Sequence, residues 1–259
     1  MSTDSTHALD TSDLEAQVKA MYEQVALAPD SDFHFETGRD LAEHLGYPAG
    51  DLDVIPQSAI ESFAGVGYFL DLASIQPGET ILDLGSGSGT DSFLAAVATG
   101  PTGRVIGIDM TRAQLDKATR LSGEATLTNS EFREGYIERP PVETGSVDCV
   151  ISNGVINLSP DKAAVFAAAA SALRPGGRLA IADIVTAEQL PDGVTCDASL
   201  WAACIGGAAQ RDHYLDAIRA AGFDIETVRD NDYRFISDRA LGATTTYGVT
   251  SISLLARRR

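Results

Sequence analysis

The chain has 259 residues, 44% of them hydrophobic, which is enough for one large α/β domain with additions and argues against wholesale disorder. Its formal net charge is −18, so its surface would repel nucleic acids and anionic membranes, and we expect neither as a partner. Residues 1–13 are polar and acidic and lack the features of a signal peptide. We therefore expect a cytoplasmic protein.

The first part of the chain predicts a tail followed by short helices. Residues 1–13 are expected to form a disordered tail. A helix is predicted over 13–27, where apolar residues recur at helical spacing and Asp13 can cap the first turn. Further helices are predicted over 39–45 and 56–63. We expect residues 14–73 to pack as an N-terminal helical lid over a site formed by residues 74–259.

The most informative pattern is TILDLGSGSGTD at residues 80–91. An apolar run ends at Asp83 and breaks into alternating glycines, and a second apolar run ends at Asp109, twenty residues past Gly89. A buried strand, a glycine turn, a helix and a second strand that ends in a carboxylate form half of a nucleotide-binding βαβ unit. Glycines let the backbone approach a ligand closely, and the second acid lies where ribose hydroxyls would bind.

Strands and helices alternate through the rest of the chain. The predicted strands are 80–84, 104–109, 130–134, 147–152 and 178–184, and the predicted helices are 91–99, 113–121, 161–173, 199–209 and 213–221. Two successive strands, 223–235 and 247–256, are expected at the end. This alternation predicts a mostly parallel α/β sheet with right-handed crossovers.

The order Asp83-x-Gly85-x-Gly87-x-Gly89 resembles motif I of the class I methyltransferases that use S-adenosylmethionine (SAM). From about residue 35 to 223 the chain resembles the arsenite-methyltransferase-like branch of that family. The matching words are LDLGSGSG at 82–89, GIDMT at 107–111, GYIE at 135–138, ISN at 151–153, VINL at 155–158, PDK at 160–162 and LRPGG at 173–177. The resemblance implies a Rossmann-like sheet whose last strand inserts antiparallel.

The resemblance also implies where the cofactor SAM would bind. The glycine loop would hold its methionine part, the acid after the second strand its ribose hydroxyls, and the Ile-Glu pair its adenine. Asn153 ends a strand, where α/β folds place ligands. The expected cofactor-binding residues are Asp83, Gly85, Ser86, Gly87, Asp109, Met110, Ile137, Glu138 and Asn153.

At the positions expected to bind the methyl acceptor, the sequence differs from the arsenite-methyltransferase-like branch. Arsenite methyltransferases bind As(III) through three cysteine thiolates, and the corresponding positions here hold Val66, Gly154 and Cys204. One thiolate would not form a cage for a soft trivalent centre, although Cys196, eight residues before Cys204, leaves a two-thiol site open. Cys204 could equally be a packing residue. The expected substrate pocket is mostly apolar and consists of Tyr68, Phe69, Gly154, Trp201 and Cys204.

We therefore expect a SAM-dependent methyltransferase that acts on a small molecule, with an organic acceptor as the main interpretation. Arsenite methylation is the alternative enzyme activity, and a SAM-binding sensor or structural protein without turnover is the alternative of another class. No catalytic base is evident from the sequence. The absence of C-x-x-C and of a histidine-rich cluster predicts no metal site.

Overall fold

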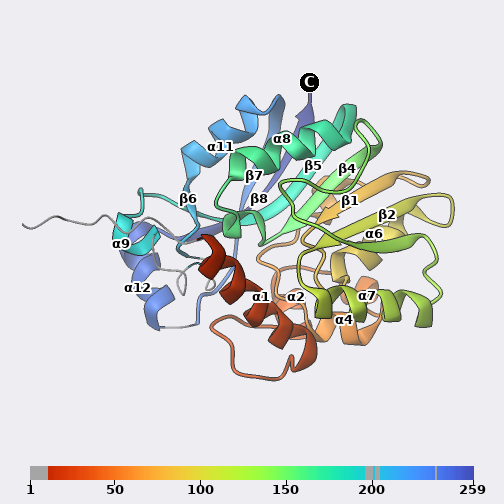
Figure 1. Cartoon of the computed structure of the whole chain (residues 1–259), viewed down its shortest axis with the longest axis horizontal. Helices are drawn as coiled ribbons and strands as arrows, with labels where there is room; N and C mark the ends of the chain where they lie inside the picture. Colours follow the sequence, from red (N-terminus) through yellow and green to blue (C-terminus); the bar gives the residue numbers. More distant parts are fainter. Residues whose placement is uncertain (1–10, 196–200, 202–204, 237) are drawn as a thin grey trace, which may run out of the picture.

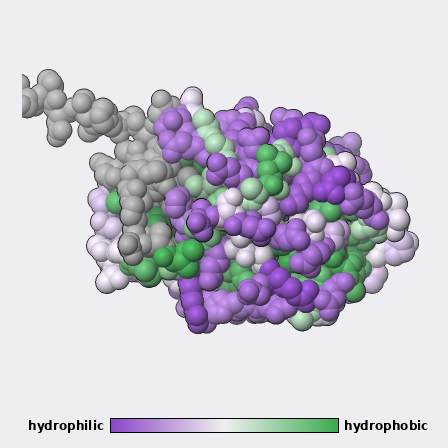
Figure 2. Space-filling model, turned by 90° about the horizontal axis from the view of Figure 1, so that it is seen from below, coloured by the Kyte–Doolittle hydropathy of each residue, from purple (hydrophilic) through white to green (hydrophobic). Residues whose placement is uncertain are grey.

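The computed structural model describes residues 11–195, 201, 205–236 and 238–259, and every structural statement here concerns these residues. They form one mixed sheet flanked by helices (Figure 1). Within these ranges no helix is both long and apolar enough to cross a membrane. The surface seen in Figure 2 is largely hydrophilic with smaller apolar areas, as the strongly negative net charge predicts.

The sheet has the strand order β3-β2-β1-β4-β5-β8-β7, with β6 paired to β5 beside this path. Strands β1 to β5 are mutually parallel where they pair, and β8 runs antiparallel to both β5 and β7. The predicted mostly parallel sheet with an antiparallel last strand is confirmed. The strands are β1 (Thr80–Leu84), β2 (Arg104–Asp109), β3 (Ser130–Glu134), β4 (Val147–Asn153), β5 (Leu173–Thr186), β6 (Ala209–Gln210), β7 (Phe223–Asn231) and β8 (Thr250–Arg258).

Helices cover both faces of the sheet, with α8 and α11 on one side and α6 and α7 on the other (Figure 1). The 3-10 turn η1 (Ile156–Leu158) follows β4 directly. The helices are α1 (Thr11–Leu27), α2 (Arg39–His44), α3 (Ala49–Leu52), α4 (Gln57–Glu61), α5 (Leu70–Ala73), α6 (Thr90–Thr99), α7 (Arg112–Glu124), α8 (Lys162–Ala172), α9 (Asp192–Thr195), α11 (Arg211–Ala220) and α12 (Asp238–Tyr247).

Alternating side chains of the central strands build two separate cores. Ile81 of β1 packs in a cluster with the α6 residue Ala95, whereas its neighbour Leu82 packs in another cluster with Phe166 of α8 and Tyr214 of α11. Successive side chains of a strand point to opposite faces, so a continuous apolar run serves both cores of a sheet covered on both sides. This is why the apolar run before the glycines predicted a buried strand.

The structure corrects several expected boundaries. Helix α1 begins at Thr11, so the last residues of the expected tail are helical and Asp13 lies in the first turn rather than capping it. Strand β5 begins at Leu173, because the segment expected to be a tight turn is accommodated as an irregularity in its pairing with β4. The short helices α3 and α5 were not predicted, since four residues carry no periodic signal.

The chain end also differs from the prediction. Helix α12 separates β7 from β8, where two successive strands were expected. Its sequence DRALGATTTY contains a glycine and three β-branched threonines, which are weak helix formers, so tertiary context outweighs propensity here. Of the helix predicted over 199–209, residues 199, 200 and 202–204 lie outside the described residues; residues 205–208 are not helical and Ala209 begins β6, so the second half of this prediction is wrong. Residues 1–10 of the predicted tail also lie outside the described residues.

Candidate functional site

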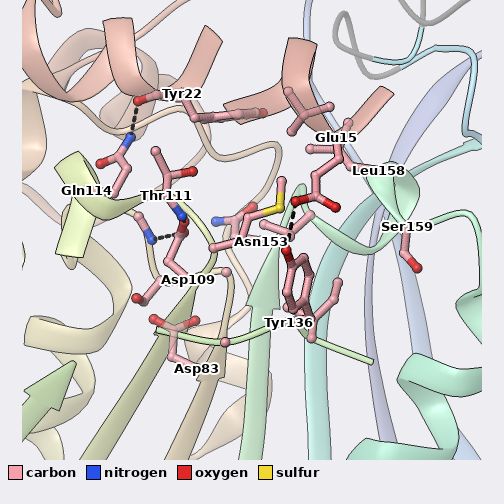
Figure 3. Close-up of a pocket in the computed structure, with 18 of the residues that line it drawn as sticks. Glu15, Tyr22, Asp83, Asp109, Thr111, Gln114, Tyr136, Asn153, Leu158 and Ser159 are labelled. Atoms are coloured by element: carbon pink, nitrogen blue, oxygen red, sulfur yellow. Dashed lines mark hydrogen bonds between the residues drawn. The ribbon is translucent and has the colours of Figure 1, made fainter. Parts of the chain in front are cut away.

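A cavity of about 530 Å³ opens at the carboxyl ends of β1, β2 and β4, and α1 lines its opposite side. Figure 3 shows Glu15 and Tyr22 of α1 on one side of this cavity, with Asp83 and Asp109 on the other. The structure brings together all nine residues expected to bind a cofactor: Asp83, Gly85, Ser86, Gly87, Asp109, Met110, Ile137, Glu138 and Asn153 all line the cavity.

The glycine loop after β1 is held against the end of β2. The backbone N–H groups of Gly85 and Ser86 both donate to the carbonyl oxygen of Ile108, at 2.8 and 2.9 Å. Gly85 has a φ of +77°, and a β-carbon there would lie 2.5 Å from the side chain of Val155. Glycine is required at this position because both the backbone conformation and the close approach exclude a side chain.

Asp109, at the end of β2, is hydrogen-bonded to the glycine loop and to the residues that follow β2. Its Oδ2 accepts a hydrogen bond from the backbone of Gly87 at 3.0 Å, and its Oδ1 accepts one from the backbone of Thr111 at 2.7 Å (Figure 3). Desolvation raises the pKa of this carboxyl group. Each carboxylate oxygen still has a lone pair that can accept a hydroxyl group from a ligand.

Asp83 and Asp91 form a buried acidic pair that lines the cavity together with the glycine loop. Asp83 is 2% exposed and accepts a hydrogen bond from Ser92 at 2.6 Å. Burial, followed by the nearby Asp91, raises the pKa of Asp83 to about 8, and burial raises that of Asp91 to about 6. Among the described residues that line the cavity, Arg139 is the only lysine or arginine. The cavity therefore suits a ligand that carries positive charge.

Part of the cavity lining is apolar. Met110, Ile137 and Leu158 supply apolar surface, and the Ser159 hydroxyl donates a hydrogen bond to the Glu138 carboxylate. Flat ligand groups bind well to a pocket of this kind, in which apolar walls carry a few polar groups. The cavity lining thus combines acidic groups with apolar surface.

Helix α1 is tied to the rest of the site at both of its ends. Near its start, the Tyr136 hydroxyl donates to the carboxylate of Glu15 at 2.7 Å, and near its end Gln114 donates to the carbonyl of Tyr22 at 2.9 Å (Figure 3). Sequence reasoning missed Glu15, Tyr22 and Gln114. Each hydrogen bond joins residues more than 90 positions apart in the sequence, so no local sequence pattern predicts it.

The residues expected to form a substrate pocket do not line this cavity in the described structure. Phe69 is fully buried in a core cluster, and the Tyr68 ring packs edge-on against Tyr47, with centroids 4.8 Å apart. Trp201 is buried, its Nε1 donates to the carbonyl of Thr195 at 2.7 Å, and it belongs to the same cluster as Phe69. For Phe69 and Trp201, burial of a large ring in the core outweighs its use as a pocket wall, whereas Tyr68 is partly buried. Cys204 and Cys196 lie outside the described residues.

Gly154, the fifth member of that expected pocket, contacts Val66. A β-carbon built on Gly154 would lie 3.1 Å from Cγ1 of Val66, and Val66 is almost fully buried. Two of the three positions to which the resemblance assigns thiolates are therefore neighbours in space, and both are apolar. Within the described ranges, no three histidine, cysteine or acidic side chains are arranged to hold a metal ion.

Comparisons with known proteins agree with this geometry. A family model described as a methyltransferase domain matches residues 75–222. The arsenite methyltransferase of Halobacterium salinarum is 42% identical over 205 residues, which cover 78% of this chain and 52% of that protein. The arsenite methyltransferase of Aquipseudomonas alcaligenes is 38% identical over 185 residues, covering 69% of this chain and 51% of that protein. The chain thus spans about half the length of these curated relatives.

Two solved structures similar to this chain are also methyltransferases. An arsenic(III) S-adenosylmethionine methyltransferase from Chlamydomonas reinhardtii superposes with a TM-score of 0.66 at 31% identity, over 80% of this chain and 71% of that one. Geranyl diphosphate methyltransferase in complex with SAM superposes with a TM-score of 0.63 at 19% identity, over 87% of this chain and 98% of that one. The second likeness is evidence of a shared fold.

Proposed function

Because the chain belongs to the family of SAM-dependent methyltransferases, we propose that it transfers the cofactor's methyl group to a small-molecule acceptor bound near the cavity. The observation that carries this proposal is the cavity itself, in which a glycine loop, a strand-end carboxylate and two buried acids meet. The position of α1 along the cavity supports the further proposal that residues 14–73 act as a lid.

The residues present fit the chemistry of SAM, which has a sulfonium and an ammonium group, a ribose and an adenine. The acidic pair Asp83 and Asp91 offers negative charge near the glycine loop, and the lining offers few cations in return. Ser86 adds a buried Oγ that has no hydrogen-bond partner among the described residues. Such an atom is costly to bury unless a ligand completes its hydrogen bonding.

We assign the cofactor-binding roles as follows. Gly85, Ser86 and Gly87 would hold the methionine part, Asp109 would accept the ribose hydroxyls, and the adenine would lie against Met110, Ile137 and Glu138, with Asn153 at the strand end nearby. SAM supplies an electrophilic methyl group when bound. The contribution of this chain is to orient the cofactor and the acceptor and to exclude water from the cavity.

Arsenite is the first candidate acceptor, because the curated relatives named above are arsenite methyltransferases. Their names favour arsenite over the organic acceptor that the sequence analysis preferred. An organic acceptor is the second candidate, and one observation favours it: Val66 and Gly154 meet where the resemblance assigns two thiolates. A soft trivalent centre prefers several soft ligands, which this pair does not supply.

Turnover with defined acceptors tests the proposal. We expect S-adenosylhomocysteine to form from SAM when the chain is incubated with its acceptor, and mass spectrometry of the products distinguishes methylated arsenic from a methylated organic compound. The parallel incubations use arsenite with a thiol reductant, and a panel of thiols, phenols and carboxylates. SAM binding without S-adenosylhomocysteine formation in any of them would overturn methyl transfer and support the binding-only interpretation.

Cofactor binding should also release a proton at neutral pH. Asp83, with a pKa of about 8, is mostly protonated at pH 7, and a cationic ligand beside it favours the ionised form. Its pKa therefore falls on binding, so SAM affinity should rise severalfold between pH 7 and 8, by at most about tenfold per pH unit. Calorimetry at pH 7 in buffers of different ionisation enthalpy measures the protons released. Asp83→Asn should abolish this buffer dependence, and a wild-type chain that shows none would contradict the prediction.

A further inference from the structure

The hydroxyl group of Tyr47, in the N-terminal segment of residues 14–73, is buried beside Asp91, which lines the cavity. Tyr47 lies between α2 and α3, is 2% exposed and donates a hydrogen bond to Oδ1 of Asp91 at 2.6 Å. Its hydroxyl oxygen also lies 2.9 Å from Nδ2 of Asn153, which donates to it. A phenol so deeply buried needs such partners, because a hydroxyl group left without a hydrogen bond in the core is destabilising.

Asn153 completes the arrangement from the end of β4. Its Nδ2 also lies 3.0 Å from Oδ2 of Asp91 and 3.1 Å from the carbonyl of Gly67, and its Oδ1 accepts the backbone N–H of Val66 at 2.8 Å. Both oxygens of the Asp91 carboxylate are therefore held, one by Tyr47 and one by Asn153. The same amide fixes the backbone of residues 66–67, where Val66 meets Gly154.

Asp91 is the acid of the buried pair that is better placed to act as an anion. Both Asp83 and Asp91 line the cavity, but Asp91 is 7% exposed against 2% for Asp83. At neutral pH the carboxyl of Asp91, with a pKa of about 6, is mostly ionised, whereas that of Asp83, with a pKa of about 8, is mostly protonated. Hydrogen bonds from Tyr47 and Asn153 to Asp91 lower its pKa against the effect of burial.

We propose that Asp91 binds the ammonium group of the cofactor and that Tyr47 is the positioning residue that orients it. This inference rests on the proposed use of SAM. The hydroxyl of Tyr47 fixes the Asp91 carboxylate, and Asn153 links that carboxylate to the segment at Val66. The N-terminal segment thereby takes part in cofactor recognition through a buried hydrogen-bond network as well as through α1. Ammonium binding by a fixed carboxylate is a charge-assisted interaction, which is the stronger kind.

The test compares Tyr47→Phe with Tyr214→Phe in SAM binding measured by calorimetry from pH 5.5 to 8.5. Tyr214 is a matched control, because it is another fully buried tyrosine that donates to a buried aspartate, Asp183, at 2.6 Å, and neither residue lines the cavity. We expect Tyr47→Phe to weaken SAM binding roughly tenfold at pH 7, as loss of a hydrogen bond to a charged group predicts. Tyr214→Phe should leave SAM affinity within twofold of the wild type.

The pH profile separates positioning from a loss of stability. Ionisation of Asp91 should make wild-type SAM affinity fall as the pH drops through about 6. Without the hydrogen bond from Tyr47 the pKa of Asp91 rises, so Tyr47→Phe should move this fall to higher pH. The groups that set the profile are Asp91, Asp83 and Tyr47, with Asp109 acting on Asp83. Asp91→Asn, which keeps the shape of the side chain, should weaken binding at pH 8 and remove the fall near pH 6.

The outcomes are distinguishable. A wild-type chain that does not bind SAM would refute the proposed function itself. A wild-type chain that binds SAM, with Tyr47→Phe indistinguishable from Tyr214→Phe in affinity and pH profile, would overturn this inference alone. If Tyr47→Phe does not fold, Asp91→Asn decides the matter, because unchanged affinity in that variant would remove Asp91 from the binding site.

Discussion

Replacing Asp109 with alanine should weaken SAM binding roughly 10- to 100-fold. The carboxylate is expected to accept the ribose hydroxyls, and a hydrogen bond to a charged group contributes on the order of 1.5–3 kcal/mol. The same carboxylate accepts hydrogen bonds from the backbone N–H groups of Gly87 and Thr111, so its removal also takes away two contacts that hold the glycine loop and the start of the next loop in place. Both effects act in the same direction. Calorimetric titration with SAM measures the change directly.

Asp116→Ala is the matched control for that variant. Asp116 is an exposed acid on α7 that pairs with Arg112 at 2.9 Å, and its loss removes the same charge from the chain without touching the cavity. An exposed ion pair contributes at most about 1 kcal/mol to stability, so this variant should bind SAM like the wild type. Asp109→Ala affinity within twofold of the wild type would remove Asp109 from the proposed site.

The double variant Val66→Cys/Gly154→Cys should bind arsenite at least tenfold more tightly than the wild-type chain. The two positions are in contact, so two cysteines there would place two thiols side by side. As(III) is soft and prefers several thiolate ligands. Gly154 has a φ of +70°, so a cysteine there costs about 1 kcal/mol of strain, while replacing Val66 removes the methyl group that a new β-carbon would crowd. Equilibrium dialysis with arsenite measures the gain.

Val66→Ser/Gly154→Ser is the control, since it makes similar changes in size and strain with a hard oxygen in place of sulfur. It should not gain arsenite affinity. If the wild-type chain already binds arsenite as tightly as the double cysteine variant, the apolar pair no longer argues against arsenite. Cys196 and Cys204, which the sequence leaves open as a two-thiol site, would then be the ligands to test, and the organic acceptor would lose its support.

Local signals in the sequence were enough for the cofactor end of the molecule. The strand, the glycine loop and the strand-end acid Asp109 lie within thirty residues of one another along the chain, from 80 to 109. Apolar runs, a glycine at a left-handed position such as Gly85, and a carboxylate at a strand end each have a local physical cause. The expected residues from 83 to 109 line the cavity, and so do Met110, Ile137 and Glu138, which the family resemblance implied, and the strand-end residue Asn153. Their individual binding roles stay predictions until the variants are measured.

The acceptor side shows where such signals fail. Tyr68, Phe69 and Trp201 were expected in a pocket because aromatic residues suit organic ligands, yet aromatic residues equally suit a core. Composition does not distinguish the two uses, since both bury the same rings. Only the packing of the N-terminal segment against the sheet decides that Phe69 is fully buried and that Tyr68 lies edge-on to Tyr47.

The sequence by itself determined the class of fold, because alternating strands and helices are read from patterns within a few dozen residues, and it indicated the cofactor through the resemblance of residues 82–89 and 107–111 to a known family. The strand order of the sheet was not predicted and is known from the tertiary structure. The tertiary structure alone decided which distant side chains meet: Glu15 with Tyr136, Val66 with Gly154, and Tyr47 with Asp91 and Asn153. Such contacts leave no periodic trace in the sequence, because each depends on how separate elements pack. The tertiary structure also sets the ionisation of the acids in the cavity. Burial raises the pKa values of Asp83 and Asp91, and burial depends on the whole fold.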